Sequence, residues 1–150
     1  MARLREASAP GDVDAVRSLF AEYARSVDEP CCFAGFEREL AELPRGFRAL
    51  YIADDDGVAA GCVGLREVDR GTVEMKRLYV RSAWRGRGLG RALAQAAIEA
   101  ARSAGYARIV LDSLPKMHEA RALYRSLDFR ETAPYLAQPT PGADCFERRL

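Results

Sequence analysis

The sequence predicts an α/β (α+β) fold, a mixed sheet of about seven strands with four helices in the order β-α-α-β-β-β-α-β-α-β-β. Two patterns lead to this prediction. Apolar segments between residues 49 and 80 are separated only by turn residues, which indicates an antiparallel meander. A helical segment then lies between apolar strands at 72–80 and 107–111, so those two strands should run parallel. At 150 residues the chain is expected to form a single domain, 1–150, with its own core.

The first part of the chain should contain one short strand and two helices. Residues 3–7 form the strand, and Gly11 or Asp12 caps the first helix after a Ser-Ala-Pro-Gly turn. An Asp-Glu-Pro sequence at 28–30 ends this helix, and a second one covers about residues 33–43. The apolar residues of the first helix share one face: Val13, Val16, Leu19, Phe20, Tyr23 and Val27.

Three strands follow as a meander. Residues 49–53 form a buried strand, an Asp-Asp-Asp-Gly hairpin turn follows, and residues 58–67 return. The three adjacent carboxylates lack EF-hand spacing, so turn chemistry explains them better than a metal does. Gly61 and Gly64 in the returning strand indicate a bulge or a close backbone approach. The central strand is Thr72–Val80.

The second half alternates helices and strands. A helix at about 88–103 ends at Gly105, and a strand at 107–111 follows. Pro115 is expected to open the last helix. Two strands, at 129–135 and 145–150, close the sheet. The predicted inner face of the helix at 88–103 consists of Leu89, Leu93, Ala96, Ala97, Ala100 and Ala104, and that of the last helix of Ala120, Leu123, Tyr124 and Leu127.

Composition excludes several classes of function. The chain is 49% hydrophobic and 30% charged with a net charge of +1, so no overall field draws it to nucleic acid or a membrane. No segment has the length of a membrane span, and the first residues have no signal-peptide core, so a cytoplasmic protein is expected. Its four cysteines (31, 32, 62 and 145) have no Cys-x-x-Cys spacing. With His118 as the single histidine, neither a zinc site nor a Ser-His-Asp triad is predicted.

A glycine-rich turn follows the central strand and begins the next helix. Residues 85–91 read Arg-Gly-Arg-Gly-Leu-Gly-Arg, and the three glycines lack the Cβ atoms that would keep backbone N–H groups away from a ligand. The helix points its free N–H groups and the positive end of its dipole at this turn, which suits phosphate. No Gly-Lys-Ser/Thr sequence completes a Walker A loop, and Arg91 stands where a Rossmann turn needs glycine or alanine.

The spacing Arg85-x-x-Gly88-x-Gly90 after an apolar strand resembles the acetyl-CoA loop of the GNAT superfamily of N-acetyltransferases, whose pattern is Arg/Gln-x-x-Gly-x-Gly/Ala. The predicted order of elements is similar to that of the family from end to end. The Ala-x-x-Leu-Tyr-x-x-x-x-Phe sequence at 120–129 looks like a second family signature. The central strand, Glu-Met-Lys-Arg-Leu-Tyr-Val, resembles that of a bacterial subgroup.

The resemblance implies where acetyl-CoA, as a co-substrate, would bind. The glycine turn takes its phosphates, and the backbone of the central strand takes its pantetheine arm. Met117 stands where the family often has an asparagine that contacts the cofactor, so an apolar wall is expected there. Asp128 replaces the glycine of the second signature, at a cost on the order of 1 kcal/mol if the site is left-handed. The implied cofactor-binding residues are Leu78, Tyr79, Val80, Arg85, Gly86, Arg87, Gly88, Leu89, Gly90, Arg91 and Met117.

Two residues are candidates for proton transfer. Glu74 lies eleven positions before Arg85, where several GNAT enzymes place a general base that deprotonates the acceptor ammonium directly or through water. The alternative is a strand carboxylate paired with Lys76 on the same face. The resemblance implies that Tyr124 donates a proton to the departing thiolate; alternatively, its ring only fills a helix–sheet interface.

The sequence therefore predicts an N-acetyltransferase that transfers an acetyl group from acetyl-CoA to the amine of a small molecule or peptide. Attack is direct, in a ternary complex, with no metal and no acyl-enzyme. The alternatives are a non-catalytic CoA-binding module and a protein or aminoacyl-tRNA N-acetyltransferase. Neither nucleic acid nor a membrane is an expected partner, and a homodimer stays open. Cys31, Cys32 and Phe33 are candidates for the acceptor-site wall, or they merely pack.

Overall fold

The computed structural model of the protein describes residues 2–150, apart from the side chain of Cys31. Its strands form one mixed sheet in the order β1-β2-β3-β4-β5-β7-β6, and the predicted order of helices and strands is confirmed. The elements are β1 (Arg3–Glu6), α1 (Asp12–Val27), the 3-10 helix η1 (Pro30–Phe33), α2 (Phe36–Glu42), β2 (Ala49–Asp55), β3 (Val58–Asp69), β4 (Thr72–Val80), the 3-10 helix η2 (Ser82–Trp84), α3 (Leu89–Ser103), β5 (Arg108–Ser113), α4 (His118–Ser126), β6 (Arg130–Thr132) and β7 (Asp144–Arg149).

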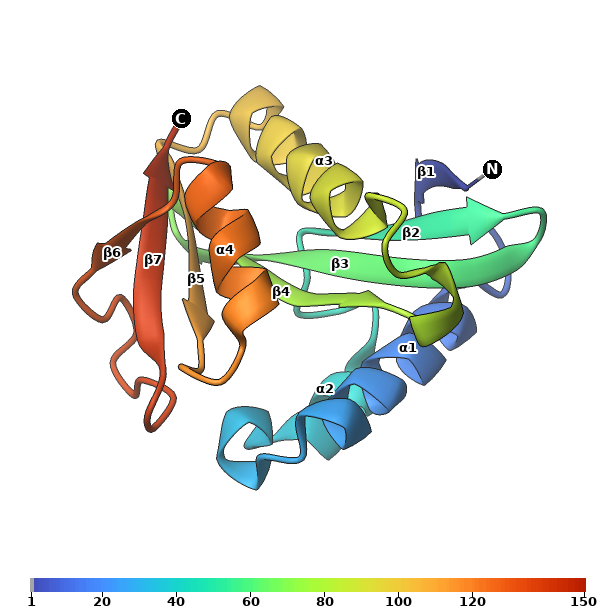
Figure 1. Cartoon of the computed structure of the whole chain (residues 1–150), viewed down its shortest axis with the longest axis horizontal. Coiled ribbons are helices and arrows are strands. Elements are labelled where there is room, and N and C mark those ends of the chain that lie inside the picture. Colours follow the sequence, from blue (N-terminus) through green and yellow to red (C-terminus); the bar gives the residue numbers. More distant parts are fainter. Residues whose placement is uncertain (1) are drawn as a thin grey trace.

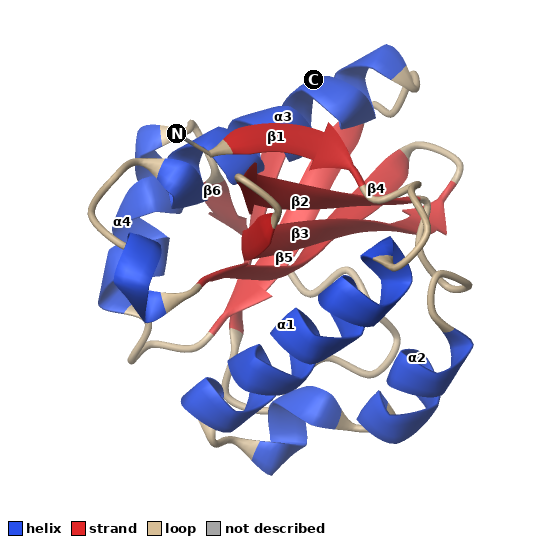
Figure 2. Ribbon diagram, turned by 90° about the vertical axis from the view of Figure 1, so that its right-hand side faces the viewer, coloured by secondary structure: helices blue, strands red, loops and turns tan. Residues whose placement is uncertain are grey.

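Helices cover both faces of the sheet. On one face, α3 and α4 pack over the strands (Figure 1), and Leu93 and Tyr124 join the larger part of the core there. On the other face lie α1 and α2 (Figure 2), where Leu19 and Phe20 pack with Ile52 in the smaller part of the core. This division follows from the pleat, because successive residues of a strand point to opposite faces.

The strands β4 and β5 pair briefly and then separate, as Figure 1 shows. Their parallel ladder runs only from Thr72 opposite Arg108 to Glu74 opposite Val110. Beyond Glu74, the described ladders pair β4 with β3 alone and β5 with β7 alone. The facing edges of the two strands therefore offer backbone N–H and C=O groups to a ligand.

The antiparallel pair β3–β4 is tightly packed and irregular. A Cβ on Gly61 would lie 2.7 Å from the carbonyl oxygen of Tyr79, so the predicted close backbone approach is confirmed. The register shifts between Cys62 and Gly64, opposite a β4 segment in which Arg77 has a φ of +61°. This extra residue in β4 is a β-bulge, which turns the following residues toward the split between β4 and β5.

Several predicted boundaries on the α1–α2 side and in the last helix were wrong. The second helix does not run from residue 33: η1 ends at Phe33, and α2 begins at Phe36 after Gly35, whose φ is +73°. The last helix begins at His118 rather than at Pro115. Proline is tolerated in the first turn of a helix, but it also occurs in the turn that precedes a helix. The local sequence does not distinguish these two positions.

The strands of the C-terminal half also differ from the prediction. The strand β5 continues to Ser113, two residues beyond the predicted end at 111. The strand β6 is shorter than predicted, and β7 begins and ends one residue earlier than predicted. The inner face of α3 is rotated, so that Ala94, Ile98 and Ala101 are buried and Ala104 is exposed. Alanine occurs all around this helix, so its spacing defines the inner face poorly.

Candidate active site

The split between β4 and β5 opens into a groove of about 650 Å³. The end of β4, the glycine turn and the start of α3 form one wall, and the end of β5 with α4 forms the other. The helix α1 contributes Tyr23 and Val27. The predicted residues that line this groove are Leu78, Tyr79, Val80, Arg85, Gly86, Gly88, Leu89, Gly90, Met117 and Tyr124.

The glycine turn ends at the first residue of α3 with its N–H groups open. Gly88 is the N-cap, with a φ of +78° and no side-chain cap. The first intrahelical bond runs from the N–H of Ala92 to the carbonyl of Gly88 at 3.0 Å, so the three N–H groups before it have no acceptor within the helix. No acidic residue lies in the first turn of α3 to oppose an anion.

The lack of a side chain at Gly90 is not required by the fold. A Cβ built there would make only ordinary contacts, 3.8 Å from Leu123 Cδ2 and 3.9 Å from Val80 Cγ2. Its φ also lies outside the left-handed region, unlike those of Gly86 and Gly88. The glycine therefore leaves the groove open beside the helix terminus without serving local backbone geometry.

Tyr124 lies where the groove meets a second, smaller cavity of about 50 Å³, and it lines both. Its ring packs edge-on against Phe129, with the centroids 5.9 Å apart, and the residue is only 8% exposed. Burial raises the pKa of the Tyr124 hydroxyl well above its ordinary value. The residue therefore fills the interface under α4 and lines both cavities, and its hydroxyl is protonated.

The smaller cavity lies on the α1–α2 side of the split. Cys32 and Phe33 of η1 contribute to its wall, together with Lys76 of β4 and Asp112 of β5. The side chain of Cys31 lies outside the described residues. Arg77 also lines this cavity, where it donates to Glu39 from Nε at 3.0 Å and from Nη2 at 2.9 Å.

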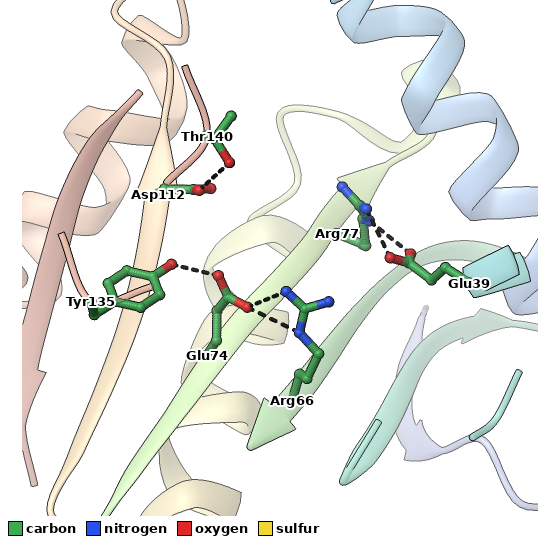
Figure 3. A network of polar contacts seen from close by, with 7 residues as sticks. All are labelled: Glu39, Arg66, Glu74, Arg77, Asp112, Tyr135 and Thr140. Atoms are coloured by element: carbon green, nitrogen blue, oxygen red, sulfur yellow. Dashed lines mark hydrogen bonds and ion pairs between the residues drawn. The ribbon is translucent and has the colours of Figure 1, made fainter. Parts of the chain in front are cut away.

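Glu74 is held in a buried network rather than at either cavity surface (Figure 3). Its side chain is 0% exposed. Arg66, its cross-strand neighbour, donates from Nη2 at 2.8 Å and from Nε at 3.2 Å to one carboxylate oxygen. The Tyr135 hydroxyl donates to the other oxygen at 2.5 Å. The alternative pairing with Lys76 is not formed among the described side chains; the carboxylate is paired with Arg66 instead.

Residues 13–129 match the acetyltransferase (GNAT) family. That match covers most of the chain. The chain belongs to the GNAT family of acetyltransferases.

Relatives of this GNAT chain agree with the match. An uncharacterized N-acetyltransferase from Schizosaccharomyces pombe is 36% identical over 138 residues, covering 88% of this chain and 85% of the relative. The uncharacterized N-acetyltransferase YjgM from Escherichia coli is 30% identical over 157 residues, covering 100% of this chain and 92% of the relative. The yncA protein from Salmonella typhimurium, solved with its cofactor acetyl-CoA, has the same fold, with a TM-score of 0.76 at 20% identity and coverage of 99% and 94%. This GNAT chain is an acyltransferase.

Two of the predicted cofactor residues lie away from the GNAT groove. The side chains of Arg87 and Arg91 are exposed and are not among the groove-lining residues. Arg91 donates from Nη2 to Ser126 Oγ at 2.9 Å, which ties the start of α3 to the end of α4.

The structure also adds residues that sequence reasoning missed. Tyr23 and Asp112 line both cavities, and Lys76 lines the smaller one. Asp112 was missed because the strand was predicted to end one residue earlier. Its one available signal was a polar residue directly after a β-branched strand, at the carboxyl edge where parallel strands commonly place functional groups.

Neither a metal site nor a membrane span is evident in the part of the chain that the structure describes. No group of three or more His, Cys, Asp or Glu side chains within residues 2–150 is placed to hold a metal. No helix in the same range is long and apolar enough to cross a membrane.

Proposed function

We propose that this GNAT enzyme transfers an acetyl group from acetyl-CoA to the amine of a small molecule or peptide, by direct attack in a ternary complex. The observation that supports this most is the meeting of two cavities at Tyr124. A long groove begins at an open helix N-terminus, and a small cavity that extends to η1 is lined by the same Tyr124. Membership of the bacterial subgroup with this central-strand sequence stays a prediction.

The groove fits acetyl-CoA in shape and in chemistry. The N–H groups at the start of α3 and the turn at Gly86–Gly88 suit the phosphates. The edge of β4 at Leu78, Tyr79 and Val80 has no strand partner on the β5 side in the described ladders and suits the amides of a pantetheine arm, which would hydrogen-bond to it as an added strand does. The carbonyl of Val80 already accepts a hydrogen bond from Arg85 Nε at 3.0 Å. Met117 supplies an apolar wall. When bound, acetyl-CoA would supply the acetyl group as an activated thioester.

Tyr124 is proposed as the general acid. When the acceptor nitrogen forms its bond to the acetyl carbon, the carbon–sulfur bond breaks and its electron pair stays on sulfur. The Tyr124 hydroxyl, which burial keeps protonated, would then give its proton to that sulfur and be reprotonated from solvent. A positioned acid contributes about 10²–10⁴-fold, and a thiolate leaving group places the expected value at the lower end.

The proton-accepting role of Glu74 stays a prediction, and the structure limits the form it can take. The carboxylate has no exposed surface and lines neither cavity. A proton from the acceptor ammonium would therefore have to reach Glu74 through an intervening group. Tyr135, whose hydroxyl donates to Glu74, is one such group, and a water molecule is another.

The proposed function is tested by measuring acetyl-CoA binding and acetyl transfer separately. Calorimetry gives the affinity for acetyl-CoA, and a thiol-release assay screens amino acids, polyamines, aminoglycosides and peptides as acceptors. Binding with turnover of at least one amine supports the proposal. Binding without turnover of any amine would instead indicate a CoA-binding module, and an absence of both would reject the cofactor assignment.

A further inference from the structure

Two oppositely charged side chains stand across the split in matching positions. The last pair of the β4–β5 ladder joins Glu74 to Val110, a separation of 36 positions, and the same separation would pair Lys76 with Asp112. Residues opposite one another in a ladder point to the same face of the sheet. Because the strands have already separated at this point, Lys76 and Asp112 instead face a common space, and both line the smaller cavity.

Lys76 makes no direct ion pair with any described side chain. No side chain described within residues 2–150 lies within hydrogen-bonding or ion-pair distance of the Lys76 ammonium group. Burial keeps the pKa of Lys76 below its ordinary value; Arg77 and Arg66 add to this effect, and Glu74 and Asp112 oppose it. A half-buried ammonium without a direct ion pair is unfavourable, so an anion that entered this cavity would be bound favourably.

Asp112 provides the complementary charge nearer to the proposed acyl site. Among the described residues, Asp112 is the only carboxylate that lines both the groove and the smaller cavity. Tyr124 also lines both. One of its oxygens accepts a hydrogen bond from Thr140 Oγ1 at 2.7 Å, which orients the carboxylate (Figure 3). An ammonium held by Asp112 would therefore lie beside Tyr124, while Lys76 lines only the smaller cavity.

We propose that Lys76 and Asp112 select an acceptor that carries a carboxylate next to its amine, as a free α-amino acid does. Lys76 binds the carboxylate, and Asp112 binds the ammonium that is to be acetylated. The small size of the cavity agrees with this pairing, since about 50 Å³ accommodates a group the size of about three to four water molecules. The inference rests on the proposed acetyl transfer and names the substrate class of that reaction.

The contact with Lys76 can be observed directly, because Lys76 and Lys116 are the two lysines of the chain. The protein labelled with carbon-13 at lysine gives one Cε resonance for each, and a Lys76→Arg variant assigns them. The standard amino acids and their primary amides are then titrated at millimolar concentration with CoA present. At least one amino acid should shift the Lys76 signal and raise its pKa, its amide should do neither, and the exposed Lys116 serves as the internal control.

Acetyl transfer to the same pairs provides the second measurement. A hydrogen bond to a charged group favours the amino acid over its amide by about 10-fold to 100-fold in kcat/KM. The Lys76→Met variant should lose most of that preference, mainly through KM, and Lys76→Arg should keep part of it. Asp112→Asn retains an acceptor for Thr140 but should weaken the amino acid and the amide alike.

The outcomes separate this inference from the proposed function. A Lys76 shift with amino acids but no acetyl transfer would support the binding site and contradict the transferase proposal. Acetyl transfer to amines with no preference for a carboxylate, or an equal loss for acid and amide in Lys76→Met, would overturn the inference alone. So would the failure of every amino acid to move the Lys76 signal.

Discussion

Replacing Gly90 by valine separates the needs of the fold from those of the ligand. In the structure, the first carbon added at this position meets Leu123 and Val80 at ordinary contact distances of 3.8 and 3.9 Å. The backbone is also not left-handed there. Glycine is about 1 kcal/mol worse than alanine in a helix and valine about 0.6, so the free energy of unfolding should change by less than about 1 kcal/mol.

The affinity for acetyl-CoA should respond quite differently. The valine γ carbons would stand at the mouth of the groove, beside the free N–H groups at the start of α3. If those groups hold the phosphates, the dissociation constant should rise by at least about tenfold, which is 1.4 kcal/mol. Titration calorimetry gives this value, and thermal denaturation of the same samples shows whether the variant is folded.

Gly90→Ala is the matched control. It adds the same Cβ without the two methyl groups, and alanine also occurs at this place in the family pattern. Its affinity should stay within about threefold of the wild-type value, well under the 1.4 kcal/mol that corresponds to tenfold. A folded Gly90→Val variant that binds acetyl-CoA as tightly as the wild type does would refute the assignment of this turn to the phosphates.

Three further changes test the chemistry. Tyr124→Phe should keep acetyl-CoA binding and lower kcat by about 10²-fold, the lower end of the range for a general acid. Since burial raises the pKa of Tyr124, this loss should be the same at every pH up to about 10, the ordinary pKa of tyrosine. A wild-type rate, with the chemical step limiting, would show that Tyr124 is only a core residue. Glu74→Gln should lower kcat mainly at low pH, where the acceptor amine is most protonated; an unchanged pH–rate profile would assign the buried carboxylate to its contacts with Arg66 and Tyr135 alone. Single serine variants of Cys31, Cys32, Cys62 and Cys145 should keep turnover within a few-fold, because direct transfer uses no thiol and burial raises the pKa of Cys62 and Cys145; a stable acetyl adduct on one of the four in intact-mass spectra would contradict this.

The order of elements could be predicted because its signals are local. The hairpin between β2 and β3 is an example. Asp56 and Gly57 have φ values of +50° and +89°, which an Asp-Gly turn supplies without help from distant residues. The glycine turn is another, since its position between a strand and a helix decides what its N–H groups can do. The conformation of these turns therefore does not depend on the residues that pack around them.

The partner of Glu74 could not be predicted, because it depends on register. The alternative to a general-base role paired Glu74 with Lys76, which lies two residues away on the same strand face. Arg66 lies opposite Glu74 rather than Met75 because the β3–β4 register shifts between Glu67 and Asp69. Tyr135 reaches the same carboxylate from 61 residues away. Neither bulges nor long-range contacts of this kind leave a periodic trace in the sequence.

The bulge at Arg77 joins the acceptor side of the molecule to the cofactor strand. A non-glycine residue at a φ of +61° is strained by on the order of 1 kcal/mol, so its neighbours must hold it there. Arg77 is only 8% exposed, donates twice to Glu39 of α2, and lies 4.6 Å from the ring centroid of Phe33 in η1. The same segment that forms one wall of the smaller cavity thus supports the conformation by which β4 turns Leu78–Val80 into the groove. A change in η1 or α2 that alters acceptor choice should therefore also shift the edge of β4 that lines the groove. We expect such a change to alter the affinity for acetyl-CoA, although η1 and α2 lie outside the groove.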